Sequence, residues 1–341
     1  APEDKFAKLL NELPSYPSDP VSEDWRKLLA DAKPSDLGLV SNGKMTLIQA
    51  VVDRSLIHHL RLLLDKGASP NCTTLRTPQS PLMLAARDGN LQVLQILMDN
   101  KDTSYGYVDP EEDTNVLTTV LKKPLQGSLS PNRDYSGCLE ALLTVLERRA
   151  EEDKEQCRTM VNQQDKKQGN SPLHYATQFW SQEVVTRILK LGANVGLKNR
   201  KDELAISGVQ PKTMEDFLDN DCLTSNKRNP ADDKFSVTFN YSFLTPPSAP
   251  AQCDTSVDPE SCPFLPCTKD NKRVKEPVQM LETDVLLGMS KCFDHRALLK
   301  HPVITSFLTK KWAHISKWYN INIVFIISFV AILTGYIFSN Y

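Results

Sequence analysis

Residues 171–199 read SPLHYATQFWSQEVVTRILKLGANVGLKN, which is a capped short helix, a turn, a second aliphatic helix and a Gly-Ala loop. Two earlier stretches repeat this pattern: SPLMLAARDGNLQVLQILMDN at residues 80–100 and MTLIQAVVDRSLIHHLRLLLDKGASPN at residues 45–71. By subtraction of their numbers, Leu47, Leu82 and Leu117 recur every 35 residues. A helix pair of this size cannot bury its own apolar face, so repeated pairs are expected to stack as a solenoid.

The recurring positions have physical reasons. Ser80-Pro81 and Ser171-Pro172 each put an N-cap side chain before a proline that needs no hydrogen-bond acceptor. Gly67 and Gly192 suit the left-handed residue that ends a second helix. The residues expected to carry this signature are Gly67, Ser80, Pro81, Leu82, Ala85, Ser171, Pro172, Leu173, His174, Ala176 and Gly192.

The pattern resembles the ankyrin repeat, whose period is about 33 residues and whose signature is TPLH. Here SPLH at Ser171–His174 is close to it and SPLM at Ser80–Met83 is a weaker match. In such a tetrapeptide we expect the histidine to bond loop backbone, rather than a metal or a substrate. A third unit is degenerate, with helices expected over Asn115–Lys122 and Ser136–Arg148 and an insertion between them.

The repeat pattern fades after Asn199. Met214–Leu223 predicts a short amphipathic helix that could cap the array. Phe235–Phe243, FSVTFNYSF, alternates as a strand does. Since a lone strand needs a partner and none is evident nearby, we expect the partner in another chain or in sequence absent here. Residues 245–276 are expected to form a flexible linker, and the spacing of Cys253, Cys262 and Cys267 does not favour a zinc site.

The C-terminal stretch predicts a membrane span. Residues 319–338, YNINIVFIISFVAILTGYIF, carry no charge and match the about 17–25 residues that cross a bilayer. Helices are expected over Glu282–Ser290 and Lys291–Lys300, and another should begin at Pro302. The lysines before the span, and none after it, place the N-terminal side in the cytoplasm; they are Lys310, Lys311 and Lys317.

Composition and motifs argue against several classes of function. The 341-residue chain has a formal net charge of −2, which argues against nucleic acid as a partner. Its eight cysteines are scattered, and its N-terminus lacks an apolar signal-peptide core, so a reducing cytoplasm is expected for the soluble part. No phosphate loop, paired-carboxylate site, nucleophile elbow or metal motif occurs, so we expect no enzyme, no cofactor and no metal site.

The order of these parts resembles the ankyrin-type transient receptor potential channels, with most likeness to the insect painless and pyrexia group. The resemblance rests on DHRALLKHPVITSFLTKKW at residues 294–312, after ankyrin repeats and a segment like FLDNDCL. The matching positions are Leu298, Leu299, His301, Pro302, Ile304, Ser306, Phe307, Leu308, Lys311 and Trp312.

The resemblance implies a homotetrameric, non-selective, calcium-permeable cation channel of the plasma membrane, involved in thermal or chemical nociception. It implies six spans per subunit, of which this chain would hold the first, so no pore residue is assigned. The repeats would bind cytoplasmic proteins. The alternative is a tail-anchored ankyrin adaptor that binds proteins at a membrane.

The expected fold is mainly α: an ankyrin-repeat solenoid, then a linker, pre-membrane helices and one transmembrane helix. The expected parts are a helical segment at residues 1–40, about four repeats with a cap at 41–223, strand and linker at 224–280, pre-membrane helices at 281–318, and the span at 319–338.

Overall fold

The computed structural model describes residues 2–14, 21–32, 37, 40–41, 45–122, 133–226, 228, 234–244 and 282–339. The chain divides into two compact units. The first comprises residues 1–210 and 243–285, and the second comprises residues 211–242 and 286–341. The predicted linker at 245–276, with its three cysteines, lies outside the described residues.

The first unit begins with two helices, α1 (Pro2–Asn11) and α2 (Glu23–Ala30). Trp25 of α2 is fully buried, and its indole Nε1–H donates to the Leu9 carbonyl at 3.1 Å. The same indole meets the imidazole of His59 edge-on, with ring centroids 4.7 Å apart. The short strands β1 (Val40–Ser41) and β2 (Met45–Thr46) follow as an antiparallel pair. The N-terminal helices therefore pack against the first repeat.

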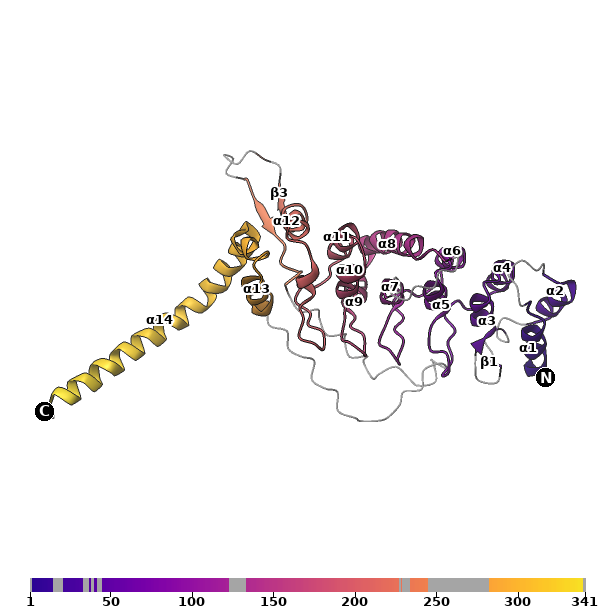
Figure 1. Ribbon diagram of the computed structural model, residues 1–341, viewed down its shortest axis with the longest axis horizontal. Helices are drawn as coiled ribbons and strands as arrows, with labels where there is room; N and C mark the ends of the chain where they lie inside the picture. Colours follow the sequence, from indigo (N-terminus) through magenta and orange to yellow (C-terminus); the bar gives the residue numbers. More distant parts are fainter. Residues whose placement is uncertain are drawn as a thin grey trace. The chain divides into compact units, whose positions relative to one another are not determined.

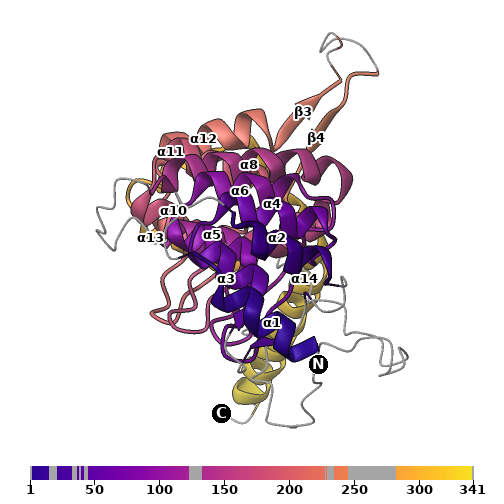
Figure 2. The same ribbon diagram turned by 90° about the vertical axis from the view of Figure 1, so that its right-hand side faces the viewer.

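Helix pairs then stack side by side (Figure 1). The first helices of the repeats form one row in which each packs on the next: α3 (Leu47–Asp53), α5 (Pro81–Asp88), α7 (Val116–Leu121) and α10 (Pro172–Phe179). The second helices are α4 (Ile57–Asp65), α6 (Leu91–Asp99), α8 (Tyr135–Glu152) and α11 (Gln182–Lys190). Seen along the array, α4, α6 and α8 form a second row beside α3 and α5 (Figure 2). The predicted helical solenoid is confirmed.

The first-row helices are buried on nearly every side. In α5, the residues Leu82–Ala86 are each at most 1% exposed. A helix can be apolar all round only when neighbours cover it on several faces. Here the preceding repeat, the following repeat and the helix's own partner do so, which explains why these short helices carry few polar residues.

The third repeat departs from the others. Its second helix, α8, has 18 residues, and an extra helix, α9 (Lys154–Asn162), follows it after the single residue Asp153. Asp153 both ends α8 and caps α9, with its carboxylate accepting the Gln156 N–H at 3.0 Å. Residues 123–132 of the predicted insertion lie outside the described part of the chain. A short 3₁₀ helix, η3 (Ala205–Gly208), packs on α10 at the end of this unit.

The second unit contains α12 (Pro211–Asn220), β3 (Leu223–Ser225), β4 (Val237–Phe239), η4 (Arg296–Lys300) and α14 (Pro302–Ser339). Helix α13 (Glu282–Lys291) leads into it from the first unit. The expectation of an unpartnered strand is wrong. β4 pairs antiparallel with β3, with Leu223 opposite Phe239 and Ser225 opposite Val237. β3 was not predicted because it has only three residues, two of them small and polar, which is too short to show the alternation of apolar and polar side chains that marks a strand.

Candidate functional site

His174 joins the start of α10 to the loop after α11. Its Nδ1 lies 3.1 Å from the Ser171 backbone nitrogen and 2.8 Å from the Ser171 Oγ. Its Nε2 lies 3.2 Å from the Glu203 carbonyl oxygen. Because an amide can only donate, Nδ1 accepts and Nε2 carries the proton. Burial lowers the pKa of His174 below 6.5, which keeps the ring neutral. The histidine therefore bonds loop backbone.

The other signature residues lie at helix ends and in the core. Ser80 caps α5 and accepts the Met83 N–H at 3.3 Å, while Pro81 and Pro172 begin α5 and α10. Gly67 and Gly192 have φ of 89° and 96°, which side-chain-bearing residues rarely adopt. The apolar members are all buried: Leu82, Ala85, Leu173 and Ala176.

A buried asparagine connects the last two repeats. The Asn162 side-chain amide donates to the Gly192 carbonyl at 3.0 Å, and its Oδ1 accepts the Asn194 N–H at 2.7 Å. Gly192 is the turn residue after α11, so one side chain holds both sides of that turn. The role of Asn162 was not predicted, because an asparagine near the end of a helix is common and its sequence neighbours do not indicate a distant partner.

A polar cluster lines a hollow beside α7 and α10. The side chain of Asp165 is 1% exposed. Its carboxylate accepts a hydrogen bond from the Tyr175 hydroxyl and forms an ion pair with Lys122 Nζ at 3.0 Å. Burial alone would raise the pKa of the Asp165 carboxyl, but these hydrogen bonds outweigh it and the pKa is lowered. Lys167 pairs with Glu112 at 2.7 Å along the same hollow, whose volume is about 440 Å³.

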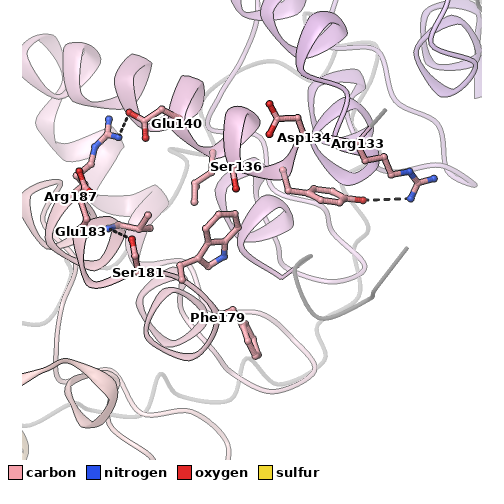
Figure 3. Close-up of a pocket in the computed structure, with 12 residues that line it drawn as sticks. Arg133, Asp134, Ser136, Glu140, Phe179, Ser181, Glu183 and Arg187 are labelled. Atoms are coloured by element: carbon pink, nitrogen blue, oxygen red, sulfur yellow. Dashed lines mark hydrogen bonds and ion pairs between the residues drawn. The ribbon is translucent and has the colours of Figure 1, made fainter. Parts of the chain in front are cut away.

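A second hollow, of about 620 Å³, lies between the starts of α8 and α11 (Figure 3). On one side, Arg187 bonds Glu140 at 2.7 Å and Glu147 at 2.6 Å. On another side, the Trp180 indole N–H donates a hydrogen bond to the Leu121 carbonyl at 3.1 Å. These polar groups already have partners, which join α11 to α8 through Arg187 and the end of α10 to α7 through Trp180, so they point to stability rather than chemistry.

The pre-membrane motif is divided between core and surface. Its buried members are Leu298, Ile304 and Phe307, and Val303 is buried beside them. Pro302 begins α14, as expected. Leu308 and Trp312 are 43% and 56% exposed, and Lys311 is also exposed. Ile315, beyond the motif, is 52% exposed as well.

Polar contacts to two other segments of the second unit, at Asp219 and Tyr241, fix the start of α14. His301 Nε2 lies 3.0 Å from the Asp219 carboxylate of α12, and its Nδ1 accepts the Val303 N–H at 3.3 Å. The Tyr241 hydroxyl lies 3.0 Å from Ser306 Oγ. The Tyr241 ring also packs on Phe307, with centroids 5.4 Å apart. The sequence indicated neither Asp219 nor Tyr241, because each meets α14 only through the folded chain.

Helix α14 continues without a break from the motif into the apolar stretch, 38 residues in all. Residues 302–337 form a helix long and apolar enough to cross a membrane, and its apolar half is exposed. Among the described residues, no group of three or more His, Cys, Asp or Glu side chains could hold a metal ion.

Comparison with known proteins agrees with these features. The ankyrin-repeat family model matches residues 168–200. The transient receptor potential cation channel protein painless of Drosophila melanogaster is 24% identical over 295 residues, which is 85% of this chain and 27% of that protein. The B-cell lymphoma 3 protein homolog of Mus musculus is 31% identical over 155 residues, which is 46% of this chain and 30% of that protein.

Among solved structures, the ankyrin repeat domain of Bcl-3 resembles the chain with a TM-score of 0.42 and 21% identity, covering 62% of this chain and 80% of that one. The chain spans about a quarter of the painless protein, at 27%. The chain therefore carries ankyrin repeats and is a homologue, over most of its own length, of the painless transient receptor potential channel.

Proposed function

We propose that residues 1–341 are the cytoplasmic ankyrin region and first membrane helix of a cation channel subunit. The observation that carries the proposal is the similarity to painless over 85% of the chain, which is too long to arise from one or two repeats. The continuity of the pre-membrane motif with an apolar helix in α14 supports it. The channel would be non-selective, calcium-permeable and used in sensory transduction such as thermal or chemical nociception.

In this role the repeats bind cytoplasmic proteins, and the contacts that the other elements of the second unit make with the start of α14 transmit the effect of this binding to the membrane helix. The motif residues act through packing: Ile304 and Phe307 fix the helix start, and His301 joins it to α12. We assign no residue here to permeation. The subunit would assemble as a homotetramer in the plasma membrane, with its N-terminal side in the cytoplasm because lysines precede the span.

The test is calcium imaging of cells that express the complete product of the gene that encodes this chain. We expect calcium entry on heating or on exposure to a noxious electrophile. Phe307→Asp, which puts a charge among buried side chains, should abolish entry, while the exposed Thr309→Asp should not. Surface labelling must show equal delivery of both variants. Absence of any evoked calcium entry in cells that deliver the wild-type protein would contradict the channel assignment.

The tail-anchored adaptor makes a different prediction. Its support is the mouse B-cell lymphoma 3 protein homolog, whose match covers 46% of the chain and leaves more than half without a counterpart. If the chain is an adaptor, a cytoplasmic partner should co-purify with it from membranes, and no stimulus should evoke calcium entry. Protease added outside sealed cells should leave the repeats intact under both proposals, so only the evoked calcium entry separates them.

A further inference from the structure

An apolar stripe runs along the part of α14 that precedes the proposed span. Leu308, Trp312, Ile315 and Tyr319 recur at intervals of four, three and four residues, which places them on one helix face. They are 43%, 56%, 52% and 49% exposed. The rings of Trp312 and Tyr319 lie 5.5 Å apart between centroids, which confirms the shared face.

The stripe begins where the part of α14 that the second unit buries in its own core ends, and Ile304, four residues before Leu308, continues the same face into that core. Val303, Ile304 and Phe307 pack inward and are at most 5% exposed. Among the residues that the structure describes in this unit, nothing covers the stripe to the same degree. Four large apolar side chains in a row on the surface indicate a binding face.

The charge around the stripe has one sign. Residues 302–339 contain Lys310, Lys311 and Lys317 and no Asp or Glu. On a helical projection at about 100° per residue, Lys310 and Lys317 fall opposite the stripe. The segment 308–319 is therefore a basic amphipathic helix, the kind that lies at the surface of an anionic membrane.

Length shows where the stripe must lie. If the hydrocarbon layer is entered at Tyr319, Trp312 stands seven residues earlier, about 10 Å out for an upright helix at 1.5 Å per residue. The polar headgroup layer on each side is only about 5–7 Å thick. An upright helix would thus hold Trp312 and Leu308 in water. A tilted helix would instead bring one face down onto the bilayer.

We propose that residues 308–319 of α14 form an interfacial anchor, with Leu308, Trp312, Ile315 and Tyr319 facing an anionic leaflet and with the positive charges of Lys310 and Lys317 on the polar face attracted to its lipids. The stripe then sets the direction in which α14 tilts. This rests on the proposed function only in requiring that the apolar half of α14 spans a bilayer. A lipid surface is favoured over a second copy because the stripe runs unbroken into the span and because the uniformly positive charge of the segment is complementary to an anionic leaflet.

The experiment uses the full chain, reconstituted in phosphatidylcholine vesicles with or without phosphatidylserine. The lipids carry bromine near either the headgroup end or the methyl end of the acyl chain. Bromine quenches only nearby tryptophans, so comparison of wild type with Trp312→Phe isolates the signal of Trp312. Trp318→Phe does the same for the residue at the edge of the span and reports insertion.

We expect Trp312 to be quenched by the shallow bromine and not by the deep one, and more strongly when phosphatidylserine is present. Lys310→Gln with Lys317→Gln should remove the phosphatidylserine dependence, while Lys300→Gln, an exposed lysine of η4, should leave it unchanged.

Quenching of Trp318 without Trp312 would overturn the anchor while keeping the span. Cross-linking between Trp312→Cys copies, with Trp312 unquenched, would replace it with a protein contact. If Trp312 is quenched equally with and without phosphatidylserine, the proposed preference of the anchor for an anionic leaflet is wrong. If neither tryptophan is quenched, α14 does not insert into the bilayer and the proposed span is wrong. A missing calcium response would contradict the proposed function but would not affect the quenching result.

Discussion

The imidazole of His174 accepts the backbone N–H of Ser171 at 3.1 Å, three residues before it in the chain. Its other nitrogen donates to the Glu203 carbonyl at 3.2 Å, twenty-nine residues later. One neutral ring thus caps a first-row helix and fixes the loop that follows the repeat. This contact explains why the histidine of SPLH belongs to the fold and not to a reaction.

Replacement of His174 by alanine should destabilise the last repeat. The buried Ser171 N–H would lose its acceptor and the Glu203 carbonyl its donor, at about 1–3 kcal/mol of unfolding free energy. Urea unfolding of the full chain in detergent, followed by circular dichroism, measures this loss. His58→Ala, at an exposed position on α4, is the control and should change little. Equal effects of the two variants would contradict the role given to His174.

Acid should weaken the fold through the same ring. Burial lowers the pKa of His174 in the folded state below 6.5, so the unfolded chain binds the proton more readily. The stabilisation is therefore complete above pH 6.5 and falls as pH drops through the folded-state pKa. The unfolding free energy of wild type and His174→Gln, measured from about pH 8 to about pH 5, should converge at the acid end. The pKa of His59 is also lowered, by burial and then by the neighbouring His58. The unfolding free energy of both wild type and His174→Gln should therefore still fall with decreasing pH through His59.

Replacement of Asp165 by alanine should cost about 2–3 kcal/mol of unfolding free energy, since hydrogen bonds to a charged group are lost. The Tyr175 hydroxyl and Lys122 would lose the acceptor that lies between α7 and α10. Lys167→Ala removes an ion pair whose lysine is 72% exposed, and should leave the urea midpoint unchanged. The assignment fails if both variants shift the midpoint by the same amount.

Tyr241 and Ser306 should be energetically coupled. A double-mutant cycle with Tyr241→Phe and Ser306→Ala should give a coupling of about 0.5–1.5 kcal/mol in thermal unfolding, the usual net value of one hydrogen bond. The ring contact with Phe307 remains in Tyr241→Phe, so the cycle isolates the hydroxyl. Tyr241→Phe paired with Ser290→Ala, whose hydroxyl donates to Leu287 within α13, should be additive. A coupling of zero would show that the two hydroxyl groups do not meet in solution.

Local signals in the sequence were sufficient for the repeats. Each of these signals acts over a few residues: the N-cap at Ser80, the proline after it and the left-handed turn at Gly192. They can therefore be recognised without knowing which distant segments pack against them. The start of α14 at Pro302 was predicted for the same reason. The extra helix α9 was missed, because Asp153 ends one helix and caps the next within a run of charged residues.

The sequence by itself determined a helical repeat array followed by one apolar helix, because caps, turns and apolar periodicity are short-range properties of the chain. Only the tertiary structure decided what those residues contact. It paired β4 with β3, brought Asp219 to His301 across 82 positions, and buried Ile304 and Phe307 of the pre-membrane motif while leaving Leu308 and Trp312 exposed. Such contacts depend on how distant segments come together, and no local pattern encodes which of several apolar faces the rest of the fold will cover.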